Sequence, residues 1–156
     1  MLNAKLKPVL LVEDDTVDAM TVKRALKDLN ITNQLVRVAN GEEALVYLRD
    51  ETKPKPCVIL LDLNMPKMNG IEFLKIAKAD DKLKRIPAIV LTTSKDDQDR
   101  FKTFQLSIAG FIVKPVDYIK FVEAMKIVNL YWTLSEMPNT EQENVNAKLQ
   151  TDTACR

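Results

Sequence analysis

The sequence predicts an α/β protein built as a doubly wound, parallel (βα)5 sheet. Short runs rich in Val, Ile and Leu alternate five times with longer amphipathic stretches. Three of the runs are apolar at nearly every position, which is typical of strands covered by helices on both faces. The 156 residues are enough for one domain with a substantial core.

The first three strands and two helices are expected in this order. Residues 8–12 (PVLLV), 35–38 (LVRV) and 57–61 (CVILL) predict the strands. Asn40 and a capping-box Glu43 predict the start of the second helix, and Gly70, after the third strand, is expected to need a positive φ. The first helix carries an apolar stripe at Val22, Ala25, Leu26 and Leu29.

The last two strands are predicted at residues 88–91 (AIVL) and 111–113 (FIV). A helix is expected over 94–107, and its acidic start (KDDQD) suits the positive end of a helix, so a capping role is favoured over a partner-specific one. Gly110 is expected to stop this helix before the last strand. The final helix carries an apolar stripe at Phe121, Met125, Val128 and Trp132.

The chain divides into an N-terminal extension (1–6), a folded domain (7–134) and a polar tail (135–156) that is expected to be disordered. A formal net charge of +1 offers no broad attraction to nucleic acid or to a membrane surface. No apolar run approaches the roughly 20 residues that span a bilayer, and no signal peptide is evident, so a cytoplasmic location is expected. Cys57 and Cys155 lie in an apolar run and in the tail, which argues against a disulfide between them.

Acidic residues directly follow two of the predicted strands. Glu13, Asp14 and Asp15 come after the first strand, and Asp62 comes after the third. The carboxyl ends of parallel strands meet at one edge of the sheet, so these side chains are expected to converge. Clustered carboxylates stay ionised together only beside a cation. Because the chain has no His, the oxygen ligands point to Mg²⁺ or a similar hard ion.

Each acidic residue also has a simpler structural explanation. Asp14 or Asp15 would suit the N-cap of the first helix, since short acidic side chains accept bonds from free helical N–H groups. Asp62 would suit the start of a turn with Asn64 and Pro66. The joint pattern, rather than any single residue, therefore carries the functional interpretation.

A hydroxyl and an ammonium group complete the pattern. Thr92 ends the fourth predicted strand and Lys114 ends the fifth, although β propensity and an ordinary surface lysine explain them singly. Together with an acid pair and a lone aspartate they suit phosphoryl transfer. In that chemistry the aspartate is the nucleophile, and a metal and a lysine neutralise the phosphoryl oxygens.

Four motifs occur in order at four strand ends: LLVEDD, LLDLNMPKMNG, VLTTS and FIVKP. On these motifs, residues 7–134 resemble the receiver domain of bacterial two-component response regulators, the CheY-like family. The resemblance implies a flavodoxin-like fold with strand order 2-1-3-4-5. It also implies a stand-alone receiver, because no second globular domain follows residue 134.

The resemblance implies a role for each matching acidic residue. Asp62 corresponds to the phosphoacceptor, and Glu13 and Asp14 to the pair that holds Mg²⁺ directly or through water. Asn64 corresponds to the residue that lends its backbone carbonyl to the metal. Asp15 falls one place beyond the pair and is treated as a neighbour.

The resemblance extends to the residues that respond to phosphorylation. Thr92 corresponds to the switch hydroxyl, and Lys114 to the phosphate-binding lysine. Phe111 corresponds to the aromatic residue whose rotamer follows activation, with a plain core Phe as the alternative. The family often has a cis bond before the residue equivalent to Pro115, an isomer that X-Pro bonds allow.

The resemblance also implies the partners. A separate sensor histidine kinase or phosphotransfer protein would supply the phosphoryl group, since the chain has no His of its own. Output would come through a conformational change and binding to a downstream protein target. The aromatic end of the last helix, IVNLYWTL, is similar to stand-alone receivers that partner bacterial phytochromes or related sensor kinases. A homodimer or a docked kinase would cover it, and folding of Trp132 onto the core would explain it equally.

Two other functions fit parts of the pattern. A non-phosphorylated pseudo-receiver, acting as a binding module, predicts the loss of one or more site residues, whereas all of them are present here. A phosphohydrolase with an Asp nucleophile, of the haloacid dehalogenase type, has a second acid two residues after the nucleophile, where this chain has Asn64. A P-loop is excluded because three glycines cannot make the motif.

Overall fold

The computed structural model describes residues 6–93, 96–114 and 117–134, without the side chains of Asp97, Phe101 and residues 131–134. Its five strands are β1 (Val9–Val12), β2 (Leu35–Val38), β3 (Val58–Leu61), β4 (Ala88–Thr92) and β5 (Gly110–Val113). Its five helices are α1 (Thr16–Asp28), α2 (Gly41–Arg49), α3 (Gly70–Ala79), α4 (Asp97–Gln105) and α5 (Tyr118–Leu134).

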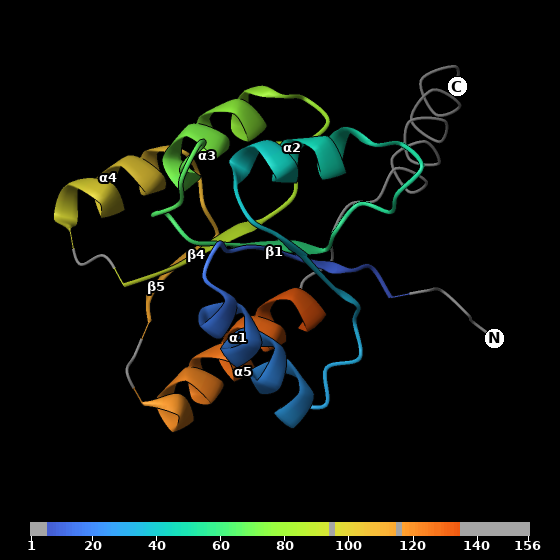
Figure 1. Ribbon diagram of the computed structural model, residues 1–156, viewed down its shortest axis with the longest axis vertical. Coiled ribbons are helices and arrows are strands. Elements are labelled where there is room, and N and C mark those ends of the chain that lie inside the picture. The colour runs from blue at the N-terminus through green and yellow to red at the C-terminus, as the bar shows by residue number, and fades with distance from the viewer. Residues whose placement is uncertain (1–5, 94–95, 115–116, 135–156) are drawn as a thin grey trace, which may run out of the picture.

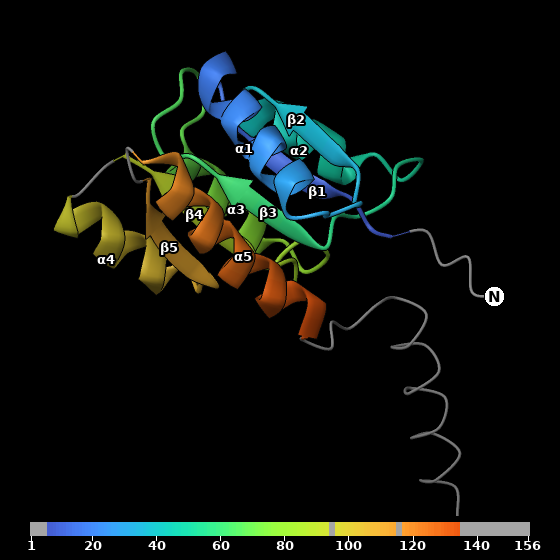
Figure 2. The same ribbon diagram turned by 90° about the horizontal axis from the view of Figure 1, so that it is seen from below.

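All neighbouring strands pair in parallel, in the order β2-β1-β3-β4-β5, which confirms the predicted topology. Helices α2, α3 and α4 lie on one face of the sheet, while α1 and α5 lie side by side on the other (Figures 1 and 2). The fold is thus the flavodoxin-like, doubly wound α/β sheet that the sequence predicts.

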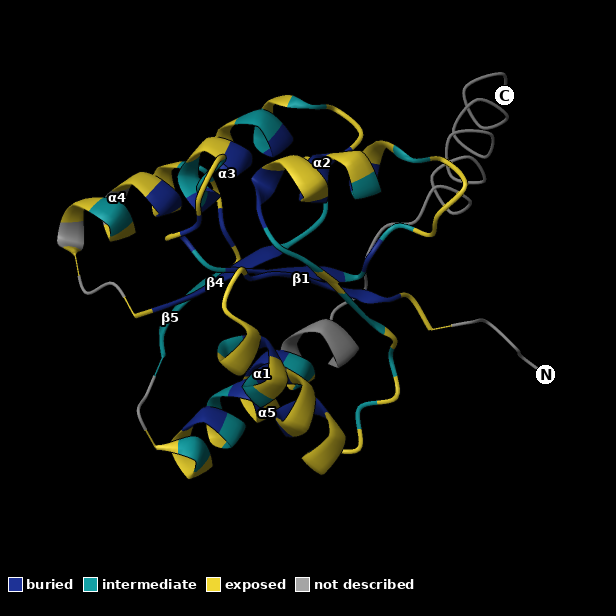
Figure 3. Cartoon of the chain, in the orientation of Figure 1, coloured by how far each residue is buried: buried dark blue, intermediate teal, exposed yellow. Residues whose placement is uncertain are grey.

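Successive residues of each strand supply the two cores on opposite faces of the sheet. Leu10 and Val12 pack with α2 and α3, whereas Val9 and Leu11 pack with α1 and α5. Every residue of β1 and β3 is buried, as the dark strands of Figure 3 show. This double burial explains why these strands are apolar at every position.

The predicted helix stripes face the core. On α1, Val22, Ala25 and Leu26 are buried and Leu29 is partly buried. On α5 the buried residues of the stripe are Phe121, Met125 and Val128, and the side chain of Trp132 lies outside the described part of the chain. No described helix is long and apolar enough to cross a bilayer.

Side-chain caps begin the helices where the sequence places them. Asp15 accepts a hydrogen bond from the Asp18 N–H at 2.9 Å at the start of α1. Asn40 accepts one from the Glu43 N–H at 3.0 Å at the start of α2. The Glu43 carboxylate accepts from the N–H of Ala39, one residue before the expected position in a capping box.

Helix α4 differs from its prediction in length and in how it ends. Its described residues, Asp97–Gln105, are fewer than the predicted 94–107, and Asp96 is the N-cap, which confirms the capping interpretation of the acidic start. The helix ends at Gln105, and Ser107, just after the C-cap Leu106, has a φ of 57° in the left-handed region. The expectation that Gly110 stops the helix is therefore wrong: Gly110 is the first residue of β5.

Candidate functional site

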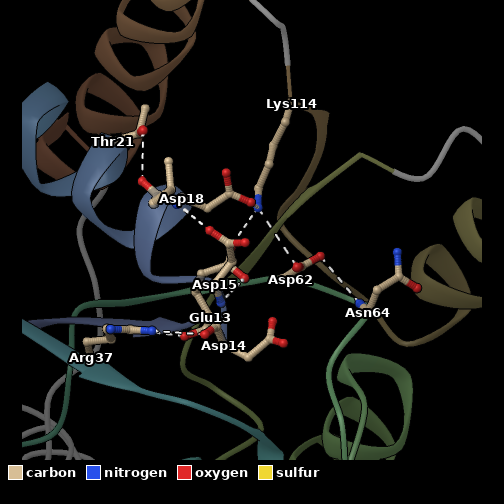
Figure 4. A network of polar contacts seen from close by, with 10 residues as sticks. Glu13, Asp14, Asp15, Asp18, Thr21, Arg37, Asp62, Asn64 and Lys114 are labelled. Carbon is tan, nitrogen blue, oxygen red and sulfur yellow. Dashed lines mark hydrogen bonds and ion pairs between the residues drawn. The ribbon is translucent and has the colours of Figure 1, made fainter.

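The predicted acidic residues meet Asn64 and Lys114 at the carboxyl edge of the sheet (Figure 4). Glu13, Asp62 and Lys114 each come one residue after a strand. Their backbone N–H groups still donate to carbonyls of neighbouring strands, at 3.0, 3.1 and 2.7 Å. The backbone of these three residues is therefore held by the sheet, although their side chains lie beyond it.

Three carboxylates form a compact group at this edge. One oxygen each from Glu13, Asp14 and Asp62 lie within 4.8 Å of one another. The Glu13 side chain is 1% exposed and that of Asp62 is 12% exposed, whereas Asp14 is exposed to solvent. A buried, a half-buried and an exposed carboxylate, all with hard oxygen donors, fit a divalent cation reached from solvent. The group could bind a metal.

The Lys114 ammonium lies among the acidic side chains, and the Lys114 side chain is only 11% exposed. It donates to Glu13 Oε1 and, at 3.0 Å, to Asp18 Oδ2, and it lies 3.8 Å from Asp62 Oδ2. Burial alone would lower the pKa of Lys114, but the hydrogen bonds to Glu13 and Asp18 and the nearby negative charge of Asp62 outweigh it and raise this pKa. Lys114 therefore stays positively charged beside Asp62.

Glu13 is the carboxylate whose proton affinity the site changes most. Burial raises its pKa to about 7, and the negative charge of Asp62 adds to this rise. The hydrogen bond and charge of Lys114 act in the opposite direction. A cation bound to the carboxylate group would favour the charged form of Glu13 in the same way as Lys114 does.

This raised pKa predicts how the metal-free protein responds to pH. A carboxyl group that binds its proton more tightly in the folded state contributes stability below its ordinary pKa of 4.5, and the contribution is lost as the pH rises through about 7. Between pH 5 and 8, the free energy of unfolding should therefore fall less in Glu13→Gln than in the wild type. The two falls should differ by about 3 kcal/mol at most. Urea unfolding in EDTA at both pH values measures this difference. Equal pH dependence in the two proteins would contradict it.

Two residues of this region escape prediction from sequence. Arg37 on β2 donates from Nε to the Glu13 carbonyl and from Nη2 to the Asp14 carbonyl, both at 3.1 Å, and so fixes the backbone of the acid pair. Its signal is that it is the one charged residue of the run LVRV. Asp18 binds Lys114 from the first turn of α1. Its signal is its place three residues after the N-cap Asp15, on the turn nearest the site.

The loop after β3 shapes the surroundings of Asp62. The Asn64 N–H donates to Asp62 Oδ1 at 3.3 Å, so Asp62 does begin the turn that its sequence suggests. Gly70, which opens α3, has no positive φ, and that expectation is wrong. It is small for a steric reason instead: a Cβ atom at Gly70 would lie 2.5 Å from the Asp62 carbonyl oxygen and 2.9 Å from Leu63 Cα.

The remaining predicted residues lie on β4 and β5. Thr92 is fully buried at the end of β4, and its carbonyl accepts the Lys114 N–H. Phe111 on β5 is half-buried, with its ring centre 6.4 Å from that of Phe104 and the Arg100 guanidinium 5.3 Å above its ring. Pro115 lies outside the described residues, and so does its expected cis bond.

Comparison with known proteins agrees with this geometry. Residues 9–126 match the model of the response regulator receiver domain family. Response regulator Rcp1 of Synechocystis sp. is 34% identical over 130 residues, which cover 81% of this chain and 88% of Rcp1.

Two solved structures are similar in fold and sequence. The phosphorylated cyanobacterial phytochrome response regulator RcpA has a TM-score of 0.80 and 34% identity, covering 86% of this chain and 99% of that one. The Mn²⁺-bound form of Rcp1 has a TM-score of 0.78 and 33% identity, covering 85% and 99%. The chain belongs to the response regulator receiver family, whose members are phosphoacceptor proteins of two-component signalling.

Proposed function

We propose that Asp62 is the phosphoacceptor of this single-domain response regulator and receives its phosphoryl group from a histidine kinase or a phosphotransfer protein. The observation that carries this proposal is the position of the Asp62 carboxylate, which lies beside both the acid pair and the charged Lys114. The receiver unit spans residues 7–134, which is supported by β1 beginning at Val9 and α5 ending at Leu134.

The transfer needs a nucleophile and positive charge around the phosphoryl oxygens. An oxygen of Asp62 forms the new O–P bond as the bond to the donor breaks, and the leaving atom keeps that electron pair. Glu13, Asp14, Asp62 and the backbone carbonyl of Asn64 would hold Mg²⁺, which supplies positive charge to the phosphoryl oxygens when it is bound. Lys114 would donate to the same oxygens, so the chain contributes positioning and electrostatics rather than further covalent steps.

The modified aspartate becomes a signal because it offers acceptor oxygens that the free carboxylate lacks. The Thr92 hydroxyl and Lys114 bind these oxygens, which draws the end of β4 toward Asp62. Phe111 on β5 packs against Phe104 and Arg100 of α4, so its ring would respond to the same movement. A downstream protein then distinguishes the two states at the surface formed by α4 and β5.

The sensor partner is a bacterial phytochrome or a related sensor kinase in this proposal. Support comes from the similarity to RcpA, which is a phytochrome response regulator. A homodimer through α5 belongs to the same proposal, and the exposed Ile119, Ile127 and Leu130 support it. We place the protein in the cytoplasm, where a kinase that uses ATP would phosphorylate it, and assign it no activity on other substrates.

Intact mass after incubation with acetyl phosphate and Mg²⁺ tests the proposed function. The wild type should gain one phosphoryl group, whereas Asp62→Ala and the wild type in EDTA should gain none. Asp81→Ala is the matched control, because Asp81 is an exposed aspartate paired with Lys84 on the surface. Failure of the wild type to gain mass under any condition would overturn the proposal and favour the pseudo-receiver.

A further inference from the structure

Lys114 has a partner, Asp18, that is not part of the three-carboxylate group. Its ammonium donates at 3.0 Å to Asp18, which projects from the first turn of α1 (Figure 4). Asp18 is not one of the three carboxylates that lie within 4.8 Å of one another. The contact that links Asp18 to this site is therefore the one with Lys114, and not a place in the metal group.

The contact with Asp18 matters because the Lys114 ammonium has few hydrogen-bond donors. A lysine ammonium has three N–H donors. Two of them are taken by Glu13 and Asp18, while Asp62 lies at 3.8 Å, beyond hydrogen-bond distance. With two N–H groups taken, one donor of the ammonium remains for a further partner, and Asp62 Oδ2 lies 3.8 Å away.

Asp18 is itself anchored. Its backbone N–H donates to the N-cap Asp15 at 2.9 Å, so the first turn of α1 fixes its position relative to the end of β1. Its side chain is 41% exposed, compared with 1% for Glu13. Lys114 therefore has one partly exposed partner, Asp18, and one buried partner, Glu13.

We propose that Asp18 is a positioning residue for phosphoryl transfer: it orients the Lys114 ammonium so that its remaining N–H meets the phosphoryl group arriving at Asp62. This proposal rests on the proposed function of Asp62. It assigns Asp18 no contact with the metal or with the phosphoryl group.

Positioning and simple charge repulsion predict opposite results for Asp18. An anion near the site repels an anionic phosphoryl donor, so charge alone predicts faster phosphorylation when Asp18 is removed. Positioning predicts slower phosphorylation in Asp18→Ala, because Lys114 loses one of its two fixed partners. Asp18→Asn separates the two effects, since it removes the charge but keeps an oxygen that accepts the bond from Lys114.

The test is the rate constant of phosphorylation by acetyl phosphate at saturating Mg²⁺, followed by intact mass. Asp18→Ala should react about tenfold more slowly than the wild type, and Asp18→Asn should stay within about threefold of it. Asp28→Ala is the matched control on the same helix, because Asp28 pairs with Arg24 and Tyr118 away from the site. Circular dichroism must show that all variants are folded at the assay temperature.

Equal rates for the wild type and Asp18→Ala, or faster reaction of both Asp18 variants, would overturn the positioning role. If even the wild type gains no phosphoryl group, the proposed function fails first. In that case a double-mutant cycle of Asp18→Ala and Lys114→Met, measured by urea unfolding in EDTA, still decides whether the contact exists. Coupling between the two substitutions supports the contact, and strictly additive effects remove the basis of the proposal.

Discussion

Gly70→Ala should lower the melting temperature by about 6–12 °C and remove most of the phosphorylation of Asp62. A methyl group at Gly70 would lie 2.5 Å from the Asp62 carbonyl oxygen and 2.9 Å from Leu63 Cα, and neither backbone atom can rotate away. The hydrogen bond from the Gly70 N–H to the Leu63 carbonyl, at 3.1 Å, holds the two segments at this separation. Overpacking against backbone costs about 3 kcal/mol, which exceeds the gain of about 1 kcal/mol that alanine normally brings to a helix.

Gly110→Ala is the matched control for this prediction. The nearest atoms to a Cβ at Gly110 belong to the Ile89 side chain at 3.8 and 3.9 Å, which is ordinary contact. Alanine also costs less backbone entropy than glycine within a strand, so Gly110→Ala should keep or slightly raise the melting temperature. Scanning calorimetry and the mass assay on both variants check this. A Gly70→Ala protein as stable as Gly110→Ala would show that the loop relaxes without cost.

The error about Gly70 shows which part of the fold a sequence pattern can predict. The alternation of apolar runs and amphipathic stretches is a local property, so it predicts β1 and a doubly wound parallel sheet correctly, whereas the strand order is what the resemblance to receiver domains implies. The closeness of Gly70 to the Asp62 carbonyl arises only when α3 folds back against the end of β3. A glycine that is required by crowding looks the same in sequence as one that is required by a positive φ. Ser107 makes the same point, since its left-handed conformation follows the end of α4, where the sequence suggests Gly110.

The site divides in the same way. The carboxyl ends of β1 and β3 are followed by Glu13, Asp14 and Asp62. A parallel sheet brings such positions together at one edge, so the convergence of these side chains is predictable. Arg37 and Asp18 act through contacts that depend on side-chain direction, which the sequence does not specify. Each looks like an ordinary surface residue until the neighbouring element is placed beside it.

Lys114→Met should destabilise the metal-free protein by about 3 kcal/mol at pH 8 but by only about 1 kcal/mol at pH 5.5. Lys114 provides the positive charge beside Glu13, whose side chain is almost fully buried. Without it the pKa of Glu13 rises beyond its value of about 7, because burial and the charge of Asp62 remain while the opposing cation is gone. At pH 5.5 Glu13 is protonated in both proteins and little changes. At pH 8 the variant must either keep an unpaired buried charge or bind a proton, and both cost stability.

The same substitution should slow phosphorylation of Asp62 by at least about 100-fold, since it removes a charged donor aimed at the phosphoryl oxygens. Lys78→Met is the matched control: Lys78 is also a half-buried lysine, but it donates to the Lys84 and Ile86 carbonyls, which precede β4, and contacts none of the three carboxylates among the described residues. It should keep the wild-type rate of phosphorylation. A loss of stability in Lys114→Met that is the same at pH 5.5 and 8 would mean that Lys114 acts through packing rather than charge. The pH dependence of unfolding, measured in urea with EDTA, therefore separates its electrostatic role in the folded protein from its role in the transfer.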